Sequence, residues 1–298
     1  MKRWATGAAL ATVAAAAAAQ GVSGRLQMSR DSDGLRESLA SAAYRGAQGF
    51  GLKAGTLHYN APGWRQSGAL LAATYQRSDA AVRLDASLGV AQIAERSHAV
   101  GALDASWPVA SASSLGVSLE RDLVNSVAGI DHGVAFTSLA LVADHAFGER
   151  FNVGIAAGST QFSNDNRRPL LRTRWNFELV PAYGLNAYLK TRSYRNSAPY
   201  RPEYFSPERL NEVSAGLSSR LRVGERVVLG AGADAGTQHT ESGSRRIWSI
   251  ALRLASPRGE AVQWSIALEA STAAGVSQLA ASNAYRYASA VAQLNLPF

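Results

Sequence analysis

The stretch from 196 to 209 combines three prolines with aromatic and arginine side chains. Proline cannot donate to a helix or sheet ladder, so this stretch is predicted to be a long loop. Aromatic faces can stack on sugar rings, and guanidinium groups can hydrogen-bond hydroxyls or carboxylates. The candidate residues for such contacts are Tyr200, Arg201, Tyr204, Phe205 and Arg209. The alternative is that the same aromatic rings only pack the loop onto its support.

Arginine supplies nearly all of the positive charge. The chain has 30 Lys and Arg against 22 Asp and Glu, a formal net charge of +8, and its lysines are Lys2, Lys53 and Lys190. An arginine excess favours forked, directional contacts to oxyanions or hydroxyls over a merely solvated surface. The charges are spread along the chain, which argues against a nucleic-acid-binding arm.

The sequence offers little for catalysis or metal binding. Cysteine is absent, so no disulfide, thiolate ligand or thiol nucleophile is available. Ser206 has no histidine near it in sequence, and we expect it to bond backbone in the turn before Pro207. We predict no enzyme, cofactor or metal, with an enzyme assembled across strands as the alternative. The histidines are widely spaced, at His58, His98, His132, His145 and His239.

Residues 1–19 have the form of a secretory signal peptide. A basic start with Lys2 and Arg3 precedes an alanine-rich apolar run that ends in an Ala-x-Ala pattern. We expect cleavage after Ala19, which leaves one domain over 20–298. That domain contains no run of 18 apolar residues, so no transmembrane helix is predicted in it.

The rest of the chain alternates apolar and polar residues with a period of two. Trp248, Ile250, Leu252 and Leu254, for example, share one face of an extended segment. About sixteen such segments occur, each near the length that a tilted membrane strand requires. They are predicted at 21–30, 35–46, 49–60, 65–77, 80–93, 97–107, 113–123, 132–146, 150–162, 169–180, 183–195, 210–222, 226–239, 245–256, 261–273 and 283–298.

Three features favour an all-β, antiparallel transmembrane barrel, with lipid against its apolar face, over a soluble sandwich. Connections after even-numbered strands are mostly short and those after odd-numbered strands longer, although 108–114 looks long on the short side. Aromatic residues gather near strand ends, as two interfacial girdles require. The last segment ends in Phe298, which resembles the C-terminal signal read by the outer-membrane barrel assembly machinery.

The first two of these features correspond to specific residues. The long connections are predicted at 60–65, 125–131, 163–169, 197–209, 240–245 and 275–283. The girdle residues are predicted to be Tyr44, Phe50, Tyr59, Trp64, Trp107, Phe147, Phe151, Phe162, Trp175, Tyr183 and Tyr285.

In such a barrel the polar faces of the strands between 169 and 222 would line the lumen. Cations and tyrosines predominate on them, which favours an anionic or neutral polar passenger over a cation. The alternative is that the charges pair with one another and fill a plugged barrel. The predicted path residues are Arg172, Arg174, Tyr188, Lys190, Arg192, Tyr194, Arg220 and Arg222.

The run Tyr204-Phe205-Ser206-Pro207-Glu208-Arg209-Leu210 resembles the Y-F-S-P-x-R-Y segment in the C-terminal barrels of exopolysaccharide exporters. These exporters are the cellulose synthase operon protein C family and the poly-N-acetylglucosamine export porin. The resemblance implies a sixteen-stranded barrel in the Gram-negative outer membrane, with both termini periplasmic. It also implies conduction of a biofilm polysaccharide. The length and residues of the loop 196–209 independently predict that it is the constriction or lid of the outer mouth.

The resemblance also implies partners. The barrel would lie among outer-membrane lipid and lipopolysaccharide, and an inner-membrane glycan synthase would supply the polymer. Those exporters carry tetratricopeptide repeats before the barrel, and this chain shows none. Either a separate periplasmic tetratricopeptide protein supplies them, or the barrel has another function. A small-solute diffusion porin and a plugged structural or receptor barrel are the alternatives for function.

Overall fold

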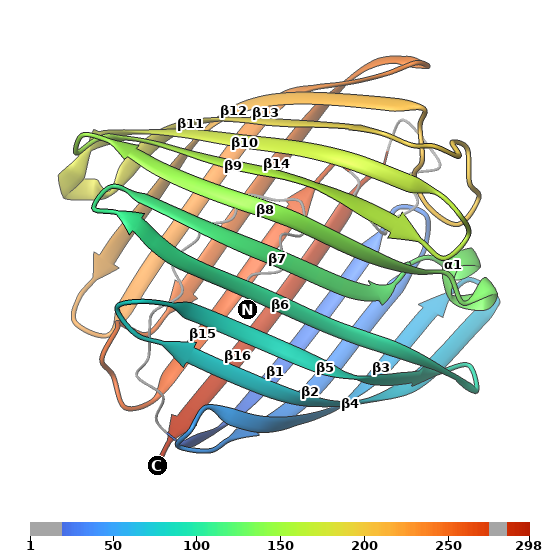
Figure 1. Ribbon diagram of the computed structural model, residues 1–298, viewed down its shortest axis with the longest axis horizontal. Coiled ribbons are helices and arrows are strands. Elements are labelled where there is room, and N and C mark those ends of the chain that lie inside the picture. The colour runs from blue at the N-terminus through green and yellow to red at the C-terminus, as the bar shows by residue number, and fades with distance from the viewer. Residues whose placement is uncertain (1–19, 274–284) are drawn as a thin grey trace.

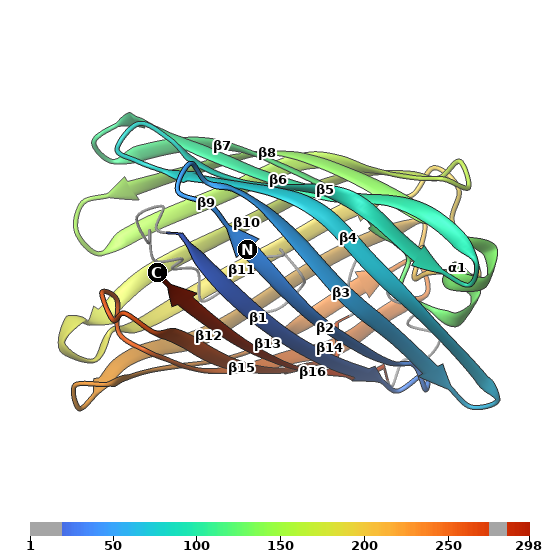
Figure 2. The same cartoon turned by 90° about the horizontal axis from the view of Figure 1, so that it is seen from below.

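The computed structural model describes residues 20–273 and 285–298, which form one closed barrel of sixteen antiparallel strands (Figures 1 and 2). Each strand pairs with its neighbours in sequence, and β16 pairs with β1 from Gly21↔Pro297 to Asp31↔Tyr287. Closure therefore leaves no open strand edge. The strands are β1 (Gly21–Asp31), β2 (Arg36–Arg45), β3 (Phe50–Ala61), β4 (Trp64–Ser78), β5 (Arg83–Ile93), β6 (Arg96–Ala110), β7 (Ser113–Leu123), β8 (Ala135–Phe147), β9 (Phe151–Phe162), β10 (Arg167–Val180), β11 (Leu185–Arg195), β12 (Arg209–Val223), β13 (Val227–Thr240), β14 (Gly243–Ala255), β15 (Gln263–Ser271) and β16 (Tyr287–Pro297).

The predicted fold class and strand count are confirmed. The largest boundary difference is at β16, which is predicted to begin at 283 and begins at Tyr287. Period-two alternation is strong enough here to find every strand, because each strand has one face in lipid and one in the lumen. The predicted signal peptide at 1–19 and most of the connection at 275–283 lie outside the described residues.

The two ends of the barrel differ in their connections. Gly21 and Pro297 lie at one end, here called the terminal end. The opposite end, here called the loop end, carries the short helix α1 (Val127–His132) (Figure 1). No helix in the described part of the chain is long and apolar enough to cross a membrane.

The predicted alternation of connection lengths is only partly correct. At the loop end 124–134 and 196–208 are long, whereas 62–63 and 241–242 are two-residue turns. The long connection predicted at 108–114 is wrong, because β6 continues to Ala110 and leaves only 111–112 before β7. A register shift between Pro108 and Ala110 accommodates the proline in the ladder.

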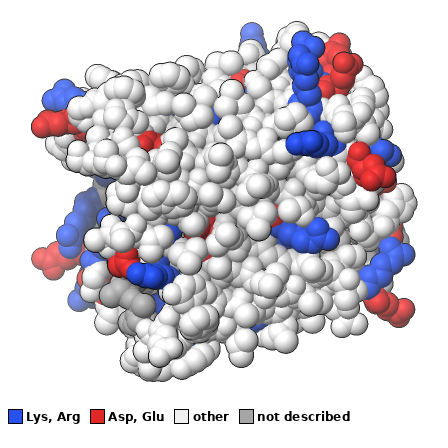
Figure 3. Space-filling model, viewed as in Figure 1, with Lys and Arg blue, Asp and Glu red and all other residues white. Residues whose placement is uncertain are grey.

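The outer face of the wall is apolar. Leu71, Leu88 and Leu141 are 63%, 71% and 66% exposed, which would be unfavourable against water over so large a surface. Figure 3 shows a largely uncharged band across the middle of one face, with charged side chains toward both ends. This face therefore suits contact with lipid, and the polar residues that alternate with it point into the lumen.

The prediction of two aromatic girdles is wrong for the loop end. At the terminal end the ring of Tyr44, which is exposed, lies 6.3 Å from that of Phe298. Toward the loop end Tyr59, Phe162 and Tyr285 are 5%, 1% and 0% exposed, so they do not face lipid. Tyr59 and Phe162 occupy inward positions of their strands, where they pack against the loops described below.

Candidate functional site

The predicted path residues occupy the inner face of β10, β11 and β12. Arg172 pairs in register with Arg192, and Arg174 pairs with Lys190. On β11, Tyr188 lies two positions before Lys190, and Tyr194 lies two positions after Arg192. Both tyrosines therefore share the inner face of the strand. Arg220 and Arg222 continue the inner face of β12 toward the terminal end, where they are exposed to the lumen mouth.

A buried ion pair neutralises part of this wall. The Nε and Nη2 atoms of Arg192 each donate to one carboxylate oxygen of Glu212 at 2.6 Å, and both side chains are buried. The amide of Gln238 donates to the same carboxylate. A forked arginine–carboxylate pair of this kind holds both groups in one geometry. Arg192 therefore presents little uncompensated charge to the lumen.

A second carboxylate, Asp234 of β13, gathers three donors. Lys190 Nζ donates at 2.6 Å and the Tyr188 hydroxyl at 3.0 Å, and Ser249 also donates. A Cβ on Gly216 would lie 2.8 Å from Cζ of Tyr188, so glycine at 216 leaves room for the tyrosine ring against the wall. The inner face of β10–β12 therefore carries less net positive charge than its own residues predict. The reason is that Asp234, the partner of Lys190, belongs to the next strand, β13.

Arginine groups stack on aromatic rings both at this level and nearer the loop end. Arg174 Cζ lies 4.3 Å from the ring centre of Tyr188. Arg168, which is 1% exposed, lies 4.8 Å from the ring of Phe162, 4.5 Å from that of Tyr194 and 5.5 Å from that of Tyr204. Such cation–π contacts are strengthened when the cation is desolvated. Arg168 therefore joins the wall of the barrel to the loop at 196–208.

Tyr204 anchors that loop inside the loop end. Its ring lies parallel to that of Phe162 at 4.0 Å and 7°. Its hydroxyl donates to Asn164 Oδ1 and accepts from Asn166 Nδ2, both at 3.0 Å. Burial raises the pKa of this hydroxyl, so it remains a donor at neutral pH. The loop is consequently folded inward against β9 and β10.

The other predicted gate residues take different positions. Arg168 Nη2 donates to the carbonyl of Phe205 at 2.8 Å, and the Phe205 ring lies 5.9 Å from the Arg245 guanidinium. Arg201 N donates to Ser206 Oγ at 2.7 Å, as predicted for a serine that bonds backbone in this turn. Tyr200 is 67% exposed and hydrogen-bonds Glu241.

The prediction that Arg209 belongs to the gate is wrong. Arg209 begins β12 in phase with the outward-facing Val213, so it lies on the outer face of the wall. Tyr200 is exposed and contacts Glu241 in the turn between β13 and β14. Tyr204 and Phe205, together with the wall residue Arg168, make the inward contacts of the loop.

The connection 124–134 forms the other half of the closure. Ser126 caps α1 by accepting from Gly129 N at 2.9 Å, and Gly133 ends it with a left-handed φ of 67°. Ile130 of α1 belongs to one buried apolar cluster with the inward-facing Leu39 and Ile93. The helix therefore covers the inner face of the wall on the side of β2–β5.

Glu203 joins the two loops. Its carbonyl accepts from Ser126 Oγ at 2.5 Å, and one carboxylate oxygen lies 3.1 Å from His132 Nδ1. The other carboxylate oxygen accepts from Asn164 Nδ2 at 3.3 Å. Across the mouth, Asn125 Nδ2 donates to Glu37 Oε2 of β2 at 2.6 Å. The two loops are thus bonded to each other, to the connection 163–166 and to β2, and this network lies across the loop end.

Arg168, Phe162 and the whole of 124–134 are absent from the predicted site. The sequence signal for Arg168 was its phase with Arg172 and Arg174, but β10 begins two residues before its predicted start. Ser126 and Gly133 are recognisable helix caps, yet α1 is too short for helical periodicity to show. Within 20–273 and 285–298 no group of three or more His, Asp or Glu could hold a metal ion.

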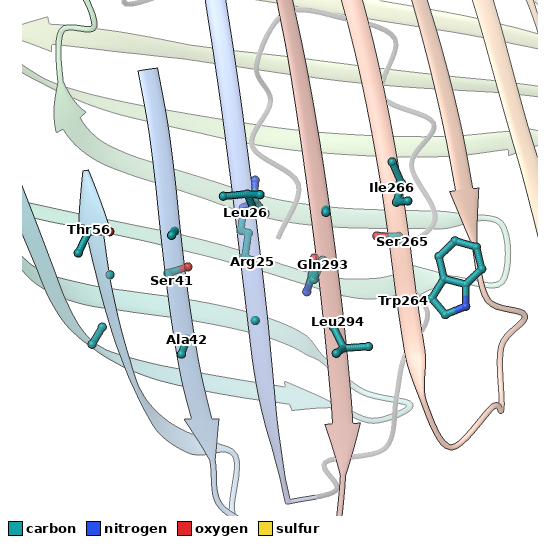
Figure 4. Close-up of a pocket in the computed structure, with 15 residues that line it drawn as sticks. Arg25, Leu26, Ser41, Ala42, Thr56, Trp264, Ser265, Ile266, Gln293 and Leu294 are labelled. Carbon is teal, nitrogen blue, oxygen red and sulfur yellow. The ribbon is translucent and has the colours of Figure 1, made fainter. Parts of the chain in front are cut away.

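A hollow of about 850 Å³ on the wall is separate from this site (Figure 4). It runs across β15, β16, β1, β2 and β3. Leu26 and Leu294 in its lining are exposed on the apolar outer face, and Trp264 is half-buried. Small residues such as Gly24 and Ala42 leave the space between them. The hollow is therefore a groove in the outer wall and not part of a path through the lumen.

Comparison with solved structures agrees with this architecture. The structure of a bacterial polysaccharide outer membrane secretin aligns over 93% of this chain and 98% of its own, with a TM-score of 0.68 and 14% identity. The fold is that of an outer-membrane barrel. OccK10 (OpdN) of Pseudomonas aeruginosa aligns over 94% and 99% with a TM-score of 0.45 and 11% identity. The L8-deletion mutant of OmpT of Vibrio cholerae aligns over 94% and 100% with a TM-score of 0.43 and 10% identity. No protein-family model and no curated protein matches the chain.

Proposed function

We propose that this barrel conducts a secreted exopolysaccharide, neutral or anionic, across the outer membrane, and that the loops 196–208 and 124–134 together gate its lumen. The observation that carries the proposal is the inner wall from Tyr204 down to Tyr188, where aromatic rings alternate with arginine groups. These groups are buried against one another while the loops are docked. With the loops displaced, such rings would stack on sugar faces and the guanidinium groups would hydrogen-bond hydroxyls. The likeness of the barrel to that of a polysaccharide secretin supports the choice of a polysaccharide as passenger.

The paired charges suit a neutral or weakly anionic polymer. Arg192 is paired with Glu212 and Lys190 with Asp234, so these cations present little uncompensated charge to the lumen. A lumen wall whose charges are paired does not bind a charged polymer tightly, so the polysaccharide can slide along it. The remaining arginines give the lumen wall a net positive charge, which disfavours passage of a polycation.

We infer that the loop end faces outward and that both termini are periplasmic. Residues 1–19 would then be removed on export, and Phe298 would serve recognition by the barrel assembly machinery. The driving force would come from an inner-membrane glycan synthase, with a periplasmic tetratricopeptide protein as the link to it. The barrel itself supplies a passive, gated route and no chemistry.

A plugged structural or receptor barrel is the second candidate, and the docked loops favour it specifically. A mouth closed by buried contacts on both sides can be permanent as well as gated. A small-solute porin is less well supported, because the wall around Arg168 is packed and not open. The two leading candidates differ in what happens when one loop is removed.

The test is single-channel conductance of the refolded barrel in a planar bilayer, intact and with Ser197–Glu208 replaced by a short Gly/Ser turn. A matched control replaces 256–262, a connection at the terminal end, in the same way. The exporter proposal predicts a silent intact barrel, a conducting 197–208 variant and a silent control. Neutral oligosaccharides should then block the open variant. Silence of all three proteins would favour the plugged barrel, and constitutive conductance of the intact protein would favour the porin.

A further inference from the structure

Eight arginines form a belt on the outer face of the wall near the loop end. Each lies in phase with the outward-facing residues of its strand, as Arg30 does with Met28 and Leu26. Each is exposed. These residues, here called the arginine belt, are Arg30, Arg36, Arg65, Arg121, Arg167, Arg195, Arg209 and Arg246.

The register places two pairs of belt arginines directly opposite one another. Arg30 of β1 faces Arg36 of β2, and Arg195 of β11 faces Arg209 of β12. The first row continues through Asn60 to Arg65. Like charges directly opposite in a sheet destabilise it. These pairs therefore do not stabilise the fold by themselves. An anion bound between the two guanidinium groups of a pair would remove their repulsion.

A second row on the other side of the barrel has the same composition. Arg121 of β7 continues through Thr137 and Gln161 to Arg167 of β10. Arg121 Nη1 donates to the Thr137 hydroxyl at 2.8 Å, and Arg167 Nε donates to Ser159 Oγ at 3.4 Å. Each guanidinium thus makes one bond to a neutral hydroxyl and keeps further N–H donors available.

In the described part of the chain, no ion pair within 4.0 Å engages a belt arginine. The ion pairs there engage Arg77, His132, Lys190 and Arg192, none of which is in the belt. Glu241, beside the start of β12, uses its carboxylate to accept from the backbone N–H groups of Glu208 and Arg209. The belt is therefore a ring of exposed cations directly above an apolar surface.

The terminal end has a different outer rim. Exposed aromatics such as Tyr44 and Phe50 lie there, and the Phe50 ring is 4.6 Å from that of Tyr75. The outward arginine of this rim, Arg77, pairs with Asp79 at 2.7 Å. An aromatic rim suits a phospholipid interface. The outer strand positions thus differ between the two rims, with exposed aromatic rings at the terminal end and arginines at the loop end.

We propose that the arginine belt binds the phosphate groups of an anionic glycolipid of the lipid A type in the leaflet around the loop end. The guanidinium fork matches phosphate oxygens in a bidentate way. Cross-strand partners lie about 5 Å apart at Cβ, so one phosphate can bridge the two arginines of a pair. The acyl chains of the same molecule would lie on the apolar residues below, such as Leu26 and Met28, which a free phosphate cannot use.

The test measures binding of bisphosphorylated lipid A to the purified full barrel in detergent micelles. One variant carries Arg30→Gln with Arg36→Gln and another carries Arg195→Gln with Arg209→Gln. A control with the same change in charge, Arg226→Gln with Arg258→Gln, removes arginines from turns at the terminal end. We expect each belt variant to bind lipid A about tenfold more weakly, as loss of charge-assisted contacts implies, with the control within about twofold of the parent.

Two further measurements decide between the proposal and simpler explanations. In lipid-free micelles the belt variants should unfold at a higher temperature than the parent, because a like-charge pair is removed, and lipid A should stabilise them less. The proposal fails if dephosphorylated lipid A binds equally well, if the control loses as much affinity, or if inorganic phosphate competes at concentrations equal to those of lipid A. Where a double variant does not refold, Arg36→Gln alone serves the same comparison. Conduction does not enter these readouts, so they stand apart from the proposed transport.

Discussion

The ring of Tyr204 lies flat on the ring of Phe162, with centres 4.0 Å apart and planes inclined by 7°. Phe162 is an inward-facing residue at the end of β9, and Tyr204 is in the middle of the loop 196–208. This stack is what turns a surface loop into a closure of the lumen. It also identifies the residue whose removal should open the barrel.

Tyr204→Ala should open the loop end. The substitution removes the stack, two hydrogen bonds and one face of the Arg168 contact, and truncating a buried aromatic costs about 3–5 kcal/mol. We expect frequent channel openings of the variant in a planar bilayer and a silent parent. Tyr200→Ala, in the same loop but exposed, is the matched control and should stay silent. Equal behaviour of the two variants would show that Tyr204 does not hold the closure.

Glu212→Gln should make the lumen more selective for anions. It leaves the buried Arg192 without its carboxylate and next to Arg172, at a cost to stability of about 3–5 kcal/mol. Reversal potentials in a KCl gradient, measured in the barrel with the shortened 197–208 loop, should shift toward the chloride potential. Glu225→Gln, in an exposed turn at the terminal end, should leave selectivity unchanged. An unchanged reversal potential for Glu212→Gln would remove the paired wall from the conduction path.

The base of the 196–208 loop should loosen in acid. Burial disfavours the Glu241 carboxylate, but hydrogen bonds from the backbone of Glu241, Arg209 and Glu208 and from the Tyr200 hydroxyl outweigh it and hold its pKa below the ordinary value of 4.5. A lowered folded-state pKa means that the carboxylate stabilises the loop fully above the ordinary value and loses this effect as pH falls through the folded value. The amide resonances of Glu208 and Arg209 should therefore move below about pH 4.5. Glu241→Gln should abolish that movement, and a titration unaffected by it would assign the change to another group.

Sequence reasoning recovered the barrel because lipid and lumen impose opposite demands on alternate residues of every strand. It placed Arg172, Arg192 and their neighbours on one inner face for the same reason. It failed where contacts are set by loops folding inward. Nothing in the period-two pattern shows that Tyr204 reaches Phe162, or that Asp234 of β13 meets Lys190 of β11.

The aromatic girdle of the loop end failed for a related reason. An aromatic near a strand end suits a membrane interface, but it suits the inside of a closed mouth equally well. Tyr59 lies in phase with Leu57, and Phe162 lies in phase with Thr160, all four facing inward and buried. The two cases are an aromatic ring that faces lipid and one that faces the lumen. The alternation of residues along the strand distinguishes them and can be taken from the sequence, whereas distance from the strand end does not distinguish them.

The two loops should be coupled mainly through Ser126 and only slightly through His132. Ser126 Oγ accepts from Gly129 N as the cap of α1 and donates to the carbonyl of Glu203, and both contacts are buried. Loss of a helix cap alone costs about 1 kcal/mol, and here the loop contact is lost with it. The His132–Glu203 pair has an imidazole that is 60% exposed, and such pairs contribute about 0–1 kcal/mol. Ser126→Ala should therefore raise the open probability and the rate of proteolysis within 124–134, whereas His132→Ala should change neither appreciably. A larger effect of His132→Ala would mean that the exposed pair, and not the buried serine, joins the two halves of the closure.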